Sequence, residues 1–294
     1  MGRILFNGKW DGIWDKPKYQ EMRDKIISEF KGLKFVEEGH RYFLGDIEFT
    51  CVSNVTHMFQ EHFDPIVKSQ ETYERNFNNP ASKYYGMTAE QIRESWELNS
   101  KQACEHGTER HGFGESCFYY MTRQYDKILP EFKDRLTKDG GFEAIYPKEI
   151  ATVKFWEDLP ISYVPIAVEN ITYNKELNYS GTFDMLFYYD AEIDGKPVDK
   201  SGLIIFDYKT NKDLYKNFQE KKLLFPFGDL LDRPLSLYEL QLSLYQLNLE
   251  QINGFRVIGR KLIWLKPDET YQKIPTTNFT QKLRNYLLHN WVNS

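Results

Sequence analysis

The stretch that most constrains the fold runs from residue 179 to residue 210. It reads YSGTFDMLFYYD, then a polar segment, then SGLIIFDYKT. Both outer runs are rich in aromatic and β-branched residues, which favour strands. The segment between them, residues 190–202, holds two glycines and a proline, which favour a turn. The stretch therefore predicts a β-hairpin.

Each strand of this hairpin holds a carboxylate, Asp184 in the first and Asp207 in the second, and Lys209 follows two residues later. Because side chains alternate along a strand, Asp207 and Lys209 should share a face, and Asp184 can lie beside them. Two carboxylates that meet in a low dielectric need a cation between them, and a few oxygen ligands suit Mg2+ or Mn2+. The alternative is a plain surface ion pair, which is typical of an isolated D-x-K triplet.

A capping box at Thr88 and Gln91 predicts the start of a helix upstream of the hairpin. We expect Gly107 to interrupt this helix and Thr108 to begin a second one. The segment that follows, HGFGE, places His111 and Glu115 on one helical face.

Two glycines, Gly112 and Gly114, lie between that histidine and glutamate. Each costs a helix about 1 kcal/mol relative to alanine, so we expect a metal site or a phosphate backbone to approach closely there. The alternative for His111 and Glu115 is an ordinary surface pair one turn apart.

Further polar residues flank the hairpin. Glu169 lies within a strand-like run, IAVENITY, and is either an edge residue or another carboxylate of the site. Lys212 and Lys216 follow Lys209 and either form a solvated surface or contact phosphates. The leucine-rich segment 235–252 predicts a helix, and the segment RVIGRKLIWLK after it predicts a strand reached by a crossover, parallel to its neighbour.

Composition excludes several classes of protein. The chain has 294 residues, a net charge of −5 and three cysteines without paired spacing, which gives no support to disulfides, a zinc site or an iron–sulfur cluster. No apolar run approaches a membrane span and the N-terminus has no signal-peptide core, so we expect an intracellular, cytoplasmic protein. A negative net charge implies that any DNA contact uses a local positive groove.

The order of these motifs, GTERHGFGE, a strand glutamate, SGTFD, DYKT and YELQLSLY, resembles the PD-(D/E)XK nuclease superfamily, in particular its RecB-like, phage-type exonuclease branch. The resemblance covers residues 88–266. It implies an α/β fold with a core of a helix, three antiparallel strands, a helix and a strand, in which helices flank a mixed central sheet. We expect residues 1–87 to form an accessory region packed on a nuclease core of residues 88–294.

The resemblance also implies roles for individual residues. Asp184, Asp207 and Lys209 would be catalytic. His111, the two aspartates and the backbone carbonyl of Tyr208 would bind Mg2+ or Mn2+. Glu115 and Glu169 match acidic positions whose roles vary. Residues implied to bind DNA are Gln241 and Tyr245 of the QxxxY motif, together with Lys212 and Lys216.

The expected function is thus a metal-dependent deoxyribonuclease that acts on DNA ends in phage or mobile-element recombination, repair or replication. Recombination or replication proteins and further copies of the chain are its expected partners. No iron–sulfur cluster and no nucleotide cofactor are expected, because the four cysteines and the GxxxxGK[ST] loop are missing. The alternatives are a non-catalytic DNA-binding or assembly subunit with the same fold, or a structure-specific endonuclease.

Overall fold

The computed structural model describes residues 2–39 and 41–290. Two compact units divide the chain: one comprises residues 1–60 and 110–294, and the other residues 61–109. The boundary predicted between residues 87 and 88 coincides with neither limit of this division. The role of residues 1–87 as an accessory region stays a prediction.

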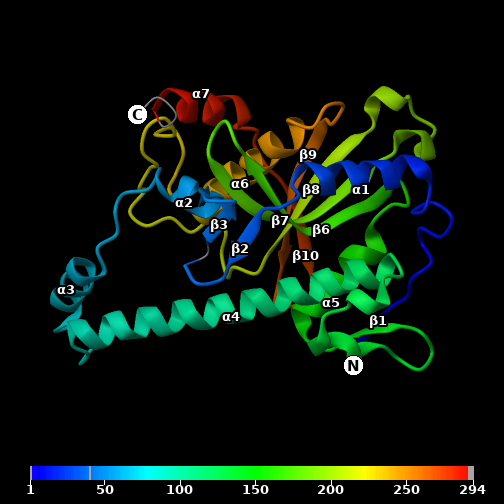
Figure 1. Cartoon of the computed structure of the whole chain (residues 1–294). Helices are drawn as coiled ribbons and strands as arrows, with labels where there is room; N and C mark the ends of the chain where they lie inside the picture. The colour runs from blue at the N-terminus through cyan, green and yellow to red at the C-terminus, as the bar shows by residue number, and fades with distance from the viewer. Residues whose placement is uncertain (1, 40, 291–294) are drawn as a thin grey trace. The chain divides into compact units, whose positions relative to one another are not determined.

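The larger unit is built on a mixed eight-stranded sheet (Figure 1). Seven strands follow the order β10-β9-β8-β7-β4-β3-β2, and β6 pairs with β7 outside that order. Their bounds are β2 (Lys34–Val36), β3 (Arg41–Leu44), β4 (Ile47–Cys51), β6 (Tyr163–Asn174), β7 (Tyr179–Tyr189), β8 (Gly202–Lys209), β9 (Val257–Leu265) and β10 (Tyr271–Pro275).

The hairpin predicted from the sequence is the pair β7 and β8, which are antiparallel, and β6 pairs antiparallel with the other edge of β7. Helix α6 (Pro234–Glu250) then connects β8 to β9, which runs parallel to β8. The expected mixed α/β sheet and the predicted crossover are both confirmed. Helix α5 (Pro147–Asp158) precedes β6 in the chain.

Strand β8 shows how the core fixes the site. All eight of its residues are buried between two neighbouring strands. The rings of Phe206 and Tyr208 contact Phe155 of α5, with ring centroids 5.4 and 5.9 Å apart. The alternate residue Lys209 faces α6, where its ammonium lies 4.2 Å from the ring centroid of Tyr238. The apolar face therefore anchors the strand and aims its polar residues at α6.

Helices cover both faces of the sheet (Figure 1). Helix α1 (Pro17–Glu29) packs on β6, α5 packs on β9 and β10, and α6 packs on β6, β7 and β9. Two further helices, α2 (Val52–His57) and α7 (Thr280–Asn290), contact α6. The remaining elements of this unit are a ribbon of β1 (Arg3–Leu5) with β5 (Phe142–Ala144) and the 3-10 turns η1 (Tyr125–Lys127), η2 (Pro130–Arg135), η3 (Ala191–Asp194) and η4 (Val198–Lys200).

The smaller unit holds α3 (Pro65–Asn76) and the first part of α4 (Ala89–Met121). The capping box predicted for α4 is present, because Gln91 N–H donates to Thr88 Oγ1 and Thr88 N–H donates to Gln91 Oε1. The interruption predicted at Gly107 is wrong, since α4 continues unbroken for 33 residues. One glycine costs a helix only about 1 kcal/mol, which is a small penalty in a helix of this length. Among the described helices, none combines the length and apolar character that crossing a membrane requires.

Candidate active site

Three side chains from three different elements of the larger unit form a candidate metal site. His111 on α4, Glu169 on β6 and Asp184 on β7 each offer a ligand atom, and these atoms lie within 4.8 Å of one another. His111 and Asp184 are predicted metal ligands, whereas Glu169 is predicted to be either an edge residue or another carboxylate of the site. The structure brings this glutamate to the same point as the other two.

The strand register explains why Glu169 and Asp184 meet. Val168 pairs with Met185 and Asn170 pairs with Phe183, so the two carboxylates between these pairs oppose each other across neighbouring strands. Like charges in that arrangement destabilise a sheet. Glu169 also has a φ of 43°, which is unfavourable for any residue except glycine. Both features cost stability, as is common for residues kept in place for function.

Helix α4 is held to helix α5 beside this cluster. The guanidinium of Arg110 donates to the carboxylate of Glu149 at 2.9 Å, and Glu149 is fully buried. Glu149 also accepts hydrogen bonds from the backbone N–H groups of residues 145 and 146. This ion pair fixes the position of the residue next to His111.

Asp184 is the most strongly hydrogen-bonded carboxylate of the cluster. Its Oδ2 accepts the backbone N–H of Tyr208 at 2.7 Å and lies 3.1 Å from His111 Nδ1. Burial alone would raise the pKa of Asp184, but His111, Lys209 and the Tyr208 N–H outweigh burial and lower it. At His111, burial alone would lower the pKa. The neighbouring Asp184 carboxylate outweighs burial, so the pKa of His111 is raised.

Asp207 and Lys209 form a buried ion pair at the end of β8. An ion pair ordinarily lowers the pKa of its carboxylate, yet the pKa of Asp207 is raised to about 6. Burial is the largest cause and repulsion from Asp184 the next, and one ammonium does not offset both. The same two aspartates outweigh burial at Lys209 and raise its pKa, so Lys209 stays charged at neutral pH.

The site is short of positive charge, and a divalent cation fits it. Burial and three neighbouring carboxylates raise the pKa of Glu169 well above its usual range. Asp207 already shares the ammonium of Lys209, yet burial and repulsion from Asp184 still raise its pKa. One imidazole nitrogen and several carboxylate oxygens are a normal donor set for a hard or intermediate divalent ion.

The two glycines of α4 have a different role from the one predicted. A Cβ at Gly114 would overlap the ring of Tyr208. At Gly112 a Cβ would lie 3.1 Å from a methyl carbon of Leu129 and 3.2 Å from the ring of Phe132. The close neighbours of both glycines are thus side chains of this protein, and the close approach of a metal or phosphate there stays a prediction.

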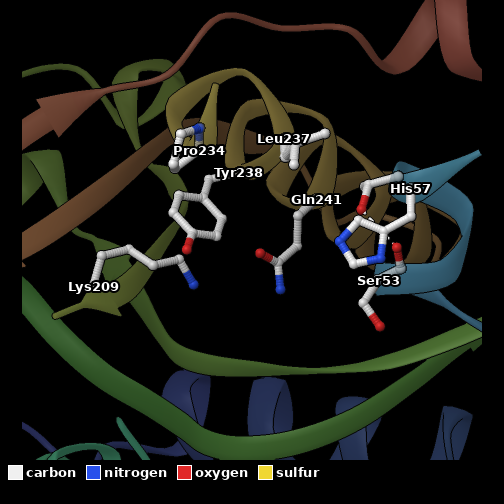
Figure 2. Close-up of a pocket in the computed structure, with 8 residues that line it drawn as sticks. Ser53, His57, Lys209, Pro234, Leu237, Tyr238 and Gln241 are labelled. Carbon is white, nitrogen blue, oxygen red and sulfur yellow. Dashed lines mark hydrogen bonds between the residues drawn. The ribbon is translucent and has the colours of Figure 1, made fainter. Parts of the chain in front are cut away.

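A cavity of about 290 Å³ lies beside the site (Figure 2). Lys209, which pairs with Asp207, forms part of its lining. Its lining comes from the end of β8, from α2 and from the first half of α6: Ser53, Thr56, His57, Lys209, Pro234, Leu237, Tyr238 and Gln241. Neither Ser53 nor His57 is among the site residues predicted from the sequence. These two residues are one turn apart on α2, but only the packing of α2 against α6 turns them toward the cavity.

The other predicted site residues lie in varied surroundings. Gln241 lines the cavity and donates to the phenol oxygen of Tyr245 at 3.1 Å, while Tyr245 itself is only 3% exposed. Glu115 accepts a hydrogen bond from Tyr119 at 3.0 Å, and burial raises its pKa. Glu115 is not one of the three clustered ligands. The roles predicted for these residues, and for the carbonyl of Tyr208, stay predictions.

Comparison with known proteins gives little beyond this geometry. Neither a protein-family model nor a curated protein matches the chain. A solved structure named "Putative exonuclease" from Eubacterium rectale is similar at 12% sequence identity and a TM-score of 0.40, over 82% of this chain and 78% of that chain.

Proposed function

We propose that this protein is a divalent-metal-dependent deoxyribonuclease of the PD-(D/E)XK type, from the RecB-like exonuclease branch. One observation carries the proposal: His111, Glu169 and Asp184 converge where Asp207 and Lys209 end a buried strand. A cluster of buried carboxylates next to a fixed ammonium is suited to phosphodiester hydrolysis. Exonuclease action in phage or mobile-element recombination, repair or replication is the finer part of the proposal and follows the motif order.

The ligands of the cation would be His111, Glu169 and Asp184, with Asp207 beside them. When bound, a Mg2+ or Mn2+ ion supplies an activated water and neutralises charge that develops on the phosphate. Lys209 contributes a fixed positive charge. Because its pKa is raised, the lysine donates hydrogen bonds to the water or the phosphate oxygens and does not accept the proton.

The cavity beside Lys209 would hold the part of the DNA backbone next to the cleaved bond. Gln241 offers an amide to this cavity, and its hydrogen bond to the buried Tyr245 fixes the orientation of that amide. This hydrogen bond supports a division of roles within the QxxxY motif, in which the glutamine contacts the ligand and the tyrosine orients the glutamine.

Cleavage of end-labelled linear DNA, with and without a metal chelator, tests the proposal. We expect Mg2+- or Mn2+-dependent release of label from linear DNA, and no cleavage of closed circular DNA. Asp184→Asn and Lys209→Ala should each lower the rate by at least about 100-fold, a common effect of removing electrostatic stabilisation. Circular dichroism must show that both variants are folded. Full activity in either variant, or no activity of the wild type with any divalent ion, contradicts the proposal and favours a non-catalytic subunit.

A further inference from the structure

The connection between β8 and α6, residues 210–233, displays aromatic rings to solvent. Phe225 and Phe218 are 79% and 67% exposed and are the two most exposed large hydrophobic side chains among the described residues. Tyr215, in the same connection, is 45% exposed. Exposed apolar groups that cluster on one segment commonly mark a binding site.

This connection nevertheless has an ordered conformation that is packed against the rest of the larger unit. Leu214, Leu223 and Phe227 are buried, and the ring of Phe227 packs against Phe59 with centroids 4.8 Å apart. The side-chain amide of Asn217 donates to the carbonyls of residues 221 and 232 at 2.8 Å. The exposed rings therefore sit on an anchored scaffold, and their exposure does not come from a lack of local structure.

Both ends of the connection reach the cavity. Lys209 immediately precedes it, Pro234 immediately follows it, and both residues line the cavity (Figure 2). Its first residues are tied down there, since Tyr238 OH donates to Asn211 Oδ1 at 2.9 Å and Trp264 Nε1 donates to Asn211 O at 2.8 Å. A chain that enters the cavity therefore passes the base of this connection.

Residues 210–233 contain five Lys or Arg and four Asp or Glu residues, and cations lie beside two of the exposed rings. Lys212 and Lys216 are exposed and form no ion pair with any carboxylate in the described part of the chain. The ammonium of Lys216 lies 4.7 Å from the ring centroid of Phe218. The guanidinium of Arg233 lies 5.6 Å from the ring of Tyr215. Rings that alternate with cations match a polymer of aromatic bases joined by phosphates.

We propose that residues 210–233 form a stacking platform for the unpaired bases of a single nucleic-acid strand, with Phe218 and Phe225 as the stacking rings. The proposal deepens the proposed function and rests on it for the substrate class. Bases paired in a duplex have no free faces for such rings, so the platform selects a single-stranded or frayed end.

Binding of a fluorescent single-stranded oligonucleotide, measured in a chelator so that no cleavage occurs, tests the platform. We expect Phe218→Ala and Phe225→Ala each to weaken binding by about 5- to 100-fold, the effect of losing one base–aromatic stack. Phe218→Trp and Phe225→Trp should keep the affinity, because each retains a stacking face. Phe6→Ala removes another exposed phenylalanine (57% exposed) in a different segment of the chain and should leave the affinity unchanged.

Oligonucleotides with a single abasic position provide the decisive comparison. In the wild type, an oligonucleotide that lacks the stacked base should bind as weakly as the intact oligonucleotide binds to the alanine variant. In the alanine variant that lacks the matching ring, the abasic position should cause no further loss of affinity. Unchanged affinity in both alanine variants, or losses that simply add, would overturn the proposal; unchanged affinity would indicate a protein partner for the rings. Because no cleavage is measured, a failure of the nuclease proposal shows separately, as binding without hydrolysis.

Discussion

At the residue scale, Glu169 combines several features that destabilise the fold when no metal is bound. It opposes Asp184 across two strands, has a positive φ and holds a proton more tightly than an ordinary glutamate. Without a bound cation, these features lower the stability of the folded chain. The same features become useful when a divalent ion neutralises the carboxylates.

Glu169→Gln separates these two effects. The amide removes the repulsion but is a poorer ligand, so we expect the chelated variant to be more stable than the wild type at pH 8. Its affinity for Mn2+ should fall by more than about tenfold, since losing a group that merely orients a ligand already costs about 10- to 100-fold. Urea unfolding in chelator and calorimetric Mn2+ titration measure the two effects. Lower stability together with unchanged Mn2+ affinity would remove Glu169 from the site.

The raised pKa of Asp207 makes a second prediction at this scale. An aspartate has a pKa of about 3.9 when the chain is unfolded, against about 6 in this fold. Between these values the native state binds more protons, so the contribution of Asp207 to stability becomes less favourable as pH rises from about 4 to about 6. The change is about 1–3 kcal/mol for this fully buried group.

Comparison with Asp207→Asn isolates this contribution from other carboxylates, such as Asp184 and Asp190, whose lowered pKa values act in the opposite direction. The unfolding free energy of the wild type minus that of the variant should fall across this pH window in the presence of chelator. A difference that rises with pH would mean that Lys209 dominates the pKa of Asp207.

At the element scale, the contact between α4 and β8 depends on glycine. Gly114→Ala should destabilise the protein by about 1–3 kcal/mol, because its Cβ overlaps the ring of Tyr208 and that strand cannot yield easily. The same change would displace the residue between Asp207 and Lys209, so metal affinity should fall as well.

Gly112→Ala is the matched control on the same helix. Its Cβ would approach side-chain atoms of Leu129 and Phe132 no closer than 3.1 Å, and alanine gains up to about 1 kcal/mol in helix propensity. We expect a change in unfolding free energy of less than about 1 kcal/mol. Equal destabilisation by both substitutions in urea unfolding would show that Tyr208 does not constrain the helix.

Elements whose signals are local could be predicted from the sequence. The β7–β8 hairpin, the leucine-rich α6 and the parallel β9 follow from residue patterns and turn residues, and the structure has all three. One local prediction failed, because Gly107 does not interrupt α4. The local preference of this glycine was weaker than the helical preference of its neighbours.

At the scale of the whole molecule, the candidate site joins segments far apart in the chain, and this limits what sequence can give. Asp184, Asp207 and Lys209 belong to one hairpin, so their proximity follows from pairing. The position of Glu169 depends on an irregular register between β6 and β7 near residue 166. The orientation of His57 depends on packing between α2 and α6. Neither the position of Glu169 nor the orientation of His57 can be predicted from a short stretch of sequence.

Metal binding should stabilise the larger unit as a whole. Because the three clustered ligands come from α4, β6 and β7, a cation bound to them resists unfolding of all three elements. At a Mn2+ concentration 100 times the dissociation constant, linkage predicts about 2.7 kcal/mol of added stability. Thermal unfolding should therefore shift upward with Mn2+ in the wild type and not in Asp184→Asn. The same shift in both proteins would place the metal elsewhere.

The position of the cation itself tests the central claim most directly. An anomalous difference map from a crystal soaked in Mn2+ should show a peak within bonding distance of His111, Glu169 and Asp184, next to Asp207. A soaked crystal with no peak there, or with its strongest peak at another acidic group, would contradict the account.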